Sequence, residues 1–107
     1  MISVDVIYHK DLIKEIVVKG HANYKAKGED IVCAAVSTAT ILTANAIEHL
    51  KLNQHIDLDV SEGYFKISLK ESQDIVLGLL KNLEYTLNEL EKQYPKYIKN
   101  RKGGITC

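Results

Sequence analysis

Four segments of the chain alternate hydrophobic with polar residues, which is the pattern of β-strands that bury one face. They cover residues 2–8, 12–20, 55–61 and 64–69. Short polar links join them in pairs, with residues 9–11 between the first two and Glu62 and Gly63 between the last two. Such links favour two antiparallel hairpins, because a glycine supplies the positive φ that a two-residue turn needs.

Two longer segments have the character of helices. From Ile31 to residue 51 the chain is rich in alanine and apolar on nearly every side, which indicates a largely buried helix with Asp30 as its N-cap. Residues 72–94 carry apolar residues three or four positions apart, which predicts a second helix that Ser72 caps and Pro95 ends. The members of its apolar face are Ile75, Leu79, Leu83, Leu87 and Leu90.

The order ββαββα predicts an α+β domain over residues 1–107, in which two helices cover an antiparallel four-stranded sheet. Residues 97–101 allow a short final segment, and we expect Cys107, which follows Gly103 and Gly104, to be disordered. The segment from Ala22 to Glu29 contains a glycine and has no apolar periodicity. It is predicted to be a loop, and a candidate lid over a site.

Composition narrows the possible functions. Fourteen basic residues balance fourteen acidic ones, so we expect no direct binding of nucleic acid, and the basic run over residues 96–102 is a weak signal. No stretch approaches the roughly 20 apolar residues that cross a bilayer, and residues 1–12 lack the apolar block of a signal peptide, so we expect no membrane partner and a cytoplasmic location. Cys33 and Cys107 form no disulfide framework, and we expect both thiols to be free.

Cys33 is the residue most suggestive of chemistry. With Asp30 as the cap it occupies the third helical position, where the partial positive charge of the helix N-terminus lowers thiol pKa values. The unpaired N–H groups of that turn are suited to binding an oxyanion. The competing interpretation is an inert apolar filler, which is the commoner role of cysteine in an apolar run.

A nucleophilic cysteine needs a base, and His21 is the best placed histidine because it opens the segment that leads to the Cys33 helix. The alternative interpretation of His21 is a solvated histidine in a loop. His49 and His55 are interpreted as structural. Asp30 either caps the helix or orients His21. Ser37 lies one turn after Cys33 on the same face, where a bond to the Cys33 carbonyl is the simplest role. No residues have the spacing of a metal site.

The stretches GHA over residues 20–22 and GEDIVCAAVS over residues 28–37 resemble the signature of the ribosomal-processing cysteine protease family. The resemblance implies a cytoplasmic endopeptidase that needs no cofactor or metal. Its substrate would be the N-terminal extension of a large-subunit ribosomal protein, the L-twenty-seven type, cut after an aromatic pair during ribosome assembly.

Carried over to this chain, the resemblance makes His21 and Cys33 the catalytic dyad and Gly20, Asp30 and Ser37 supporting residues. It also implies a homodimer, which agrees with the limited surface that a short chain buries. Two other functions stay open on the sequence: a non-catalytic ribosome-associated module that binds the same peptide, and a purely structural dimerisation domain.

Overall fold

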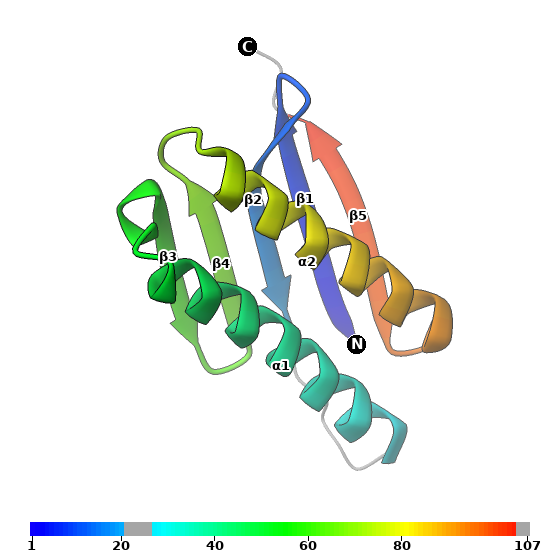
Figure 1. The fold of residues 1–107 in the computed structure, drawn as a ribbon. Coiled ribbons are helices and arrows are strands. Elements are labelled where there is room, and N and C mark those ends of the chain that lie inside the picture. Colours follow the sequence, from blue (N-terminus) through cyan, green and yellow to red (C-terminus); the bar gives the residue numbers. More distant parts are fainter. Residues whose placement is uncertain (21–26, 105–107) are drawn as a thin grey trace.

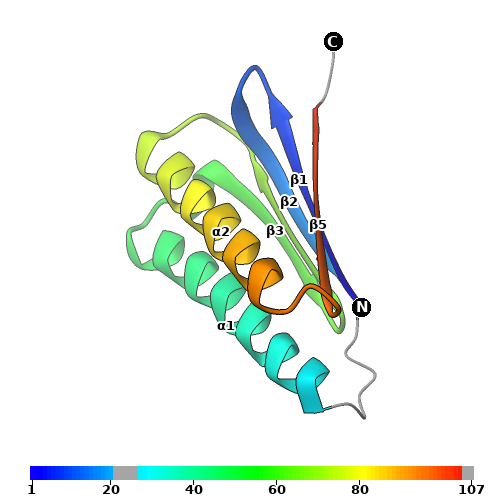
Figure 2. The same ribbon diagram turned by 90° about the vertical axis from the view of Figure 1, so that its right-hand side faces the viewer.

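The computed structural model describes residues 1–20 and 27–104, and only the backbone of residues 27–30 and 104. Two helices cover one face of a single sheet, and the other face is bare (Figures 1 and 2). The strands follow the order β3-β4-β2-β1-β5 across the sheet. In chain order the elements are β1 (Ile2–His9), β2 (Leu12–Lys19), α1 (Lys27–His49), a 3-10 turn (Asn53–His55), β3 (Ile56–Ser61), β4 (Tyr64–Leu69), α2 (Asp74–Gln93) and β5 (Ile98–Gly104).

The prediction of an antiparallel four-stranded sheet in the order ββαββα is wrong. The sheet has five strands in the order ββαββαβ, and β5 pairs in parallel with β1. The final segment is longer than the residues 97–101 that the sequence allowed, since β5 continues to Gly104, while Cys107 lies outside the described residues. Both β4 and β1 are antiparallel to β2, so they point the same way. After β4, α2 returns along the helix side and β5 completes a right-handed crossover (Figure 1).

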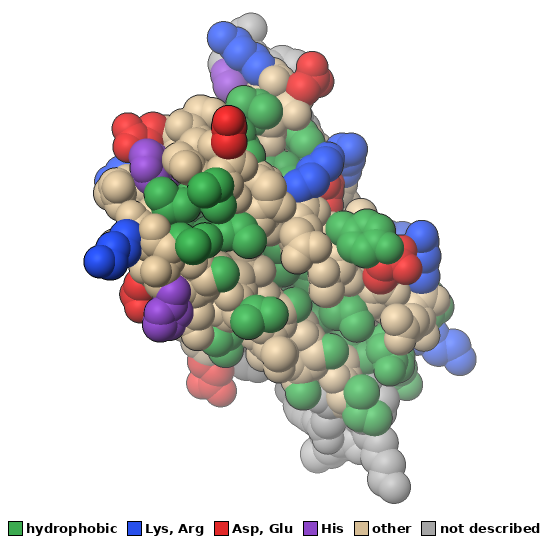
Figure 3. All heavy atoms as spheres, in the orientation of Figure 1, with side chains coloured by type: hydrophobic (Ala, Val, Ile, Leu, Met, Phe, Trp, Pro, Cys, Tyr) green, Lys and Arg blue, Asp and Glu red, His purple; other side chains and the backbone are tan. Residues whose placement is uncertain are grey.

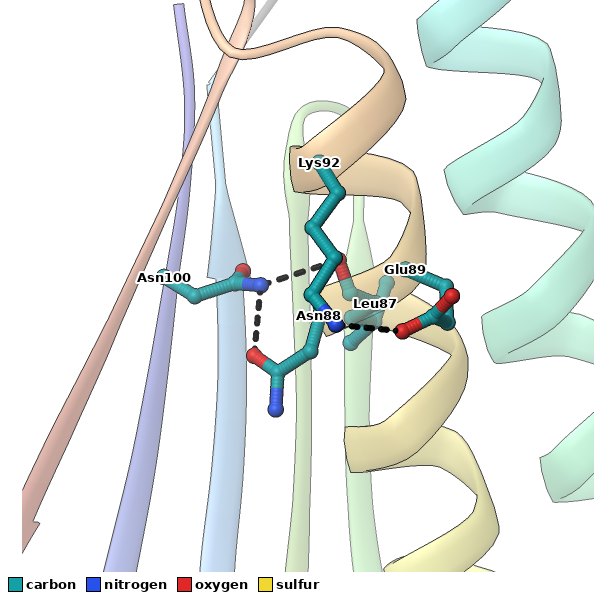
Figure 4. Close-up of polar contacts among 5 residues, drawn as sticks. All are labelled: Leu87, Asn88, Glu89, Lys92 and Asn100. Atoms are coloured by element: carbon teal, nitrogen blue, oxygen red, sulfur yellow. Dashed lines mark hydrogen bonds and ion pairs between the residues drawn. The ribbon is translucent and has the colours of Figure 1, made fainter.

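Few side chains hold β5, which explains why hydrophobic alternation does not reveal it. Ile98 is its one fully buried side chain among the residues whose burial is described. The Asn100 side chain donates from Nδ2 to the Leu87 carbonyl and to Asn88 Oδ1, both at 2.9 Å (Figure 4). Arg101 Nε lies 2.9 Å from Asp5 Oδ1 on β1. Backbone pairing and these polar contacts therefore place the strand.

The hydrophobic core lies between the helices and the covered face of the sheet. Ile2, Val4 and Val6 of β1 point into it, as their alternation predicts. In β2 the pairing with β1 shifts by one residue between Ile7 and Tyr8, so a β-bulge lets Ile13 and Ile16 both be buried. From α2 the buried apolar residues are Val76, Leu80, Leu83 and Leu87.

One acidic side chain is buried within this layer. Glu84 of α2 accepts a hydrogen bond from the Tyr8 hydroxyl at 2.5 Å, and Lys81 Nζ lies 3.4 Å from the same carboxylate oxygen. Burial and, next, the hydrogen bond to Glu84 raise the pKa of Tyr8. The contact joins β1 to α2, and it satisfies a carboxylate that would otherwise be costly to bury.

Three predictions about the helices need correction. Helix α1 begins at Lys27, so its start includes the last residues of the predicted loop, and residues 22–26 lie outside the described part. It is not buried on nearly every side, because Ile31, Ile41 and Leu42 are each more than half exposed. Helix α2 is capped by Gln73 and not by Ser72: Gln73 Oε1 accepts from the Val76 N–H at 2.8 Å.

The length and composition of residues 31–49 suffice for a membrane-crossing helix, although we expected no such stretch. In this structure 28% of the stretch is buried inside the protein. Its buried residues are Val32, Val36, Thr40, Thr43 and Ile47. Helix α1 therefore packs on the domain with one side and leaves a second side uncovered.

We expect Ile98→Ala to reduce the free energy of unfolding by about 2–5 kcal/mol, the usual cost of truncating a fully buried isoleucine. Lys99→Ala is the matched control, because Lys99 is the exposed neighbour on the same strand and should change stability by less than about 0.5 kcal/mol. Urea unfolding followed by circular dichroism measures both. Equal, small losses of unfolding free energy in the two variants would show that β5 is not part of the cooperative core.

Candidate active site

A mostly apolar cleft lies between α1 and the hairpin formed by β3 and β4. It encloses about 280 Å³. One wall consists of α1 residues that share a side of the helix, and the other wall is the end of the hairpin. The lining residues of α1 are Cys33, Val36, Ser37, Thr40 and Ile41, and those of the hairpin are Val60, Ser61, Glu62, Gly63, Tyr64 and Phe65. Ile2, Val18 and Gly20 close the cleft.

Cys33 is partly exposed on the cleft side of α1. Its neighbours on the inner side, Val32 and Val36, are buried, and its own side chain packs against the edge of the hydrophobic core. The thiol is free. Cys33 is therefore neither a fully buried filler nor a solvated surface residue, but a thiol at the wall of a cleft.

The start of α1 changes how this thiol can be activated. Cys33 is the seventh residue of the helix and not the third, and Asp30 lies in the first turn and not at the N-cap. The helix dipole acts mainly within the first turn. The unpaired N–H groups belong to the first four residues, so the Cys33 N–H bonds within the helix. A separate base must therefore activate Cys33, and its own N–H does not serve an oxyanion.

Ser37 lines the same cleft one turn after Cys33, as the spacing predicts. The expected bond from its hydroxyl to the Cys33 carbonyl is not among the side-chain bonds of the described residues, whereas Thr40 bonds back to the carbonyls of Val36 and Ser37 at 3.1 and 3.0 Å. The exposed Ser37 hydroxyl therefore faces the cleft without a partner inside the described helix.

His21, the predicted base, lies outside the described residues, but the residue before it lines the cleft. The other histidines have other surroundings. His55 Nδ1 lies 3.0 Å from Glu71 Oε1, and His49 is exposed in the last turn of α1, 16 residues or about 24 Å along the helix from Cys33. Gly20 thus lines the cleft, whereas His49 and His55 are not among the residues that line it.

Gly20 is held between the chain start and the hairpin. Its φ is +122°, and a Cβ at this position would lie 2.4 Å from the Met1 carbonyl oxygen. Its N–H donates to the Gly63 carbonyl oxygen at 3.0 Å. Only glycine fits, because both the backbone conformation and the close approach exclude a side chain. Gly20 thereby fixes where the chain leaves β2 toward His21.

The hairpin wall of the cleft was missed by the sequence analysis. The turn at Glu62 and Gly63 was predicted correctly, and Gly63 has a φ of +69°. Nothing in the alternation of β3 and β4 shows that their turn faces Cys33. Leu58 and Val60 hold inward positions of β3 and are nevertheless 47% and 58% exposed, which only the structure shows.

The cleft suits a nucleophile acting on a bound chain segment. Its apolar lining favours apolar side chains of a ligand, and the thiol of Cys33 and the hydroxyl of Ser37 are its reactive groups on α1. Within the described part of the chain, no three His, Cys, Asp or Glu side chains are grouped as a metal site would require.

Comparison with known proteins gives the family of this chain. A family model described as cysteine protease Prp matches residues 1–99. The ribosomal processing cysteine protease Prp of Staphylococcus aureus is 29% identical over 102 residues, which is 92% of this chain and 96% of the relative.

Two solved structures of the Staphylococcus aureus protease have the same fold. One, in complex with a substrate peptide, superimposes with a TM-score of 0.87 at 25% identity and covers 95% of this chain and 99% of the other. The second, with a covalently linked product peptide, has a TM-score of 0.83 at 27% identity and covers 98% and 100%. The fold, the thiol in its cleft and these relatives define a cysteine peptidase. The chain belongs to the cysteine protease Prp family.

We expect Gly20→Ala to destabilise the fold by roughly 1–3 kcal/mol through backbone strain, and to lower peptidase activity about 10- to 100-fold, because displacing the next residue misaligns the site. Gly78→Ala is the matched control, since nothing lies within 4 Å of a Cβ at that helical position. Thermal unfolding and peptide hydrolysis measure the two effects. Wild-type stability and activity in Gly20→Ala would contradict the assigned role.

Proposed function

We propose that this peptidase removes the N-terminal extension of a large-subunit ribosomal protein of the L-twenty-seven type during ribosome assembly, by cleavage after an aromatic pair. The observation that carries the proposal is the position of Cys33 on the wall of an apolar cleft. Membership in a family whose relative is named a ribosomal processing protease supports the substrate class. The apolar lining agrees with aromatic side chains in the bound segment.

In the proposed reaction His21 takes the proton from the Cys33 thiol, and the thiolate attacks the carbonyl carbon of the scissile bond. The tetrahedral intermediate collapses as the C–N bond breaks, and His21 returns the proton to the leaving amine. Water, deprotonated by His21, then hydrolyses the thioester and frees the Cys33 thiol. The covalently linked product peptide of the relative supports a covalent route.

The supporting residues have distinct proposed roles. Gly20 positions the backbone before His21, and the Ser37 hydroxyl is directed to the cleft where the peptide would bind. Because Asp30 lies inside the first turn of α1, capping no longer accounts for it. We assign it the orientation of His21, which is the other role that the sequence left open.

The proposed setting is the cytoplasm, with the protein acting as a homodimer and without direct contact to nucleic acid or membrane. The exposed side of α1 supports the dimer, because Ile31, Ile41 and Leu42 are each more than half exposed, and exposed apolar patches often mark protein interaction sites. Figure 3 shows hydrophobic side chains on the surface over both helices.

We expect the wild-type protein to shorten the extended ribosomal protein by one cut after the aromatic pair, measured as intact mass under reducing conditions. Cys33→Ala should abolish the cut, and His21→Ala should slow it by about 10²–10⁴-fold, the usual effect of losing a general base. His49→Ala is the matched histidine control and should cleave at the wild-type rate.

A folded wild type that binds the extended protein and leaves it intact would contradict the proposal. That outcome would favour the non-catalytic peptide-binding module. A purely structural domain would be favoured if neither the wild type nor any variant bound or cut the extended protein.

We expect light scattering after size exclusion to give twice the chain mass of 12.0 kDa. Leu42→Asp should shift the protein toward the monomer, because Leu42 is 67% exposed on α1 and a charge there would have to be desolvated in an interface. Tyr85→Asp is the control on α2, where Tyr85 is 64% exposed. A monomeric wild type at all concentrations would exclude the dimer.

A further inference from the structure

We propose that Glu62 is a specificity residue of this peptidase and recognises a lysine or arginine side chain of the substrate near the scissile bond. The inference rests on the proposed cleavage of a peptide in the α1–hairpin cleft. Among the described residues that line the cleft, Glu62 is the only one with a charged side chain. A described lining that is neutral and mostly apolar apart from the Glu62 carboxylate favours a ligand that is apolar with one cation.

The Glu62 carboxylate has no cation of its own within the described part of the chain. The nearest lysine of the hairpin is Lys66 on β4, which lies opposite Asp59 in the strand register. Lys66 instead contacts Glu15 on β2, with 3.5 Å between Nζ and Oε1. The ion pairs of the described residues therefore leave the Glu62 carboxylate available to a cation of the substrate.

Strand pairing and a hydrogen bond fix the backbone around Glu62, so the direction in which its side chain leaves the turn is also fixed. Ser61 is paired with Tyr64 in the strand register, and the Gly63 carbonyl accepts the Gly20 N–H at 3.0 Å. The Glu62 side chain is exposed, so it is limited to the rim by its backbone and not by packing. A peptide with an apolar side chain on the cleft floor, near Val36 and Phe65, would bring a neighbouring residue past this carboxylate.

An exposed pair of this kind has a modest effect that salt reduces. We expect a cation at the matching substrate position to raise kcat/KM by about two- to five-fold, the size of a surface ion pair. The change should appear in KM, because Glu62 binds a side chain and takes no part in the reaction.

The test uses peptides that contain an aromatic pair and one lysine moved along successive positions, each compared with its acetyl-lysine form. Wild type should prefer lysine over acetyl-lysine by about two- to five-fold at one position, and 0.5 M salt should reduce the preference. Glu62→Gln should remove it, and Glu62→Lys should replace it with a preference for glutamate there. Glu48→Gln, an exposed change at the other end of α1, should keep the wild-type preference.

A wild type without preference at any position, or a preference that survives in Glu62→Gln, would overturn the inference. If no peptide is cleaved, the endopeptidase proposal fails, and the Glu62 inference is decided by binding of the same labelled peptides to Cys33→Ala. Fluorescence anisotropy then reports the dissociation constants. If Cys33→Ala bound the lysine and acetyl-lysine peptides with equal affinity at every position, the Glu62 inference would also be overturned.

Discussion

The hydrogen bond from the Gly20 N–H to the Gly63 carbonyl is the interaction on which the site depends. It joins the end of β2 to the turn between β3 and β4, two segments that are 43 residues apart. The Met1 carbonyl confines Gly20 from the other side. The bond holds the turn of the hairpin beside Gly20, and both residues line the cleft.

Hydrophobic alternation predicted those elements whose burial is one-sided and regular. The first four strands and both hairpins follow from it, because inward positions such as Val4, Ile16 and Ile67 are buried. The fifth strand has one buried side chain, Ile98, and is placed by pairing with β1 and by contacts of Asn100 and Arg101. Such contacts depend on partners distant in the sequence, so no local pattern could have revealed them.

The helices show how tertiary packing overrides periodicity. The predicted stripe of α2 included Ile75 and Leu79, yet Val76 and Leu80 are the fully buried residues of its first turns. The stripe is correct at Leu83 and Leu87. The helix lies on β1 and β2 as well as beside α1, so the covered side is broader than a single row of positions (Figure 1).

The sequence could predict only those residues of the candidate site that belong to a recognisable motif. Gly20, Cys33 and Ser37 line one cleft, while His21 lies outside the described residues, and the roles of all four stay predictions. The opposite wall, with Glu62, could not be predicted, since its position follows from the crossover of α1 between β2 and β3. The helix start at Lys27 also escaped prediction, because Gly28 is a poor helix former.

The parallel pairing of β1 with β5 has a consequence for the order of folding. Strand β1 finds one of its two neighbours only when the chain has been made as far as β5. Until then the backbone groups on that edge of β1 stay open to other chains. The nascent protein therefore carries an unprotected sheet edge from the synthesis of β1 until that of β5.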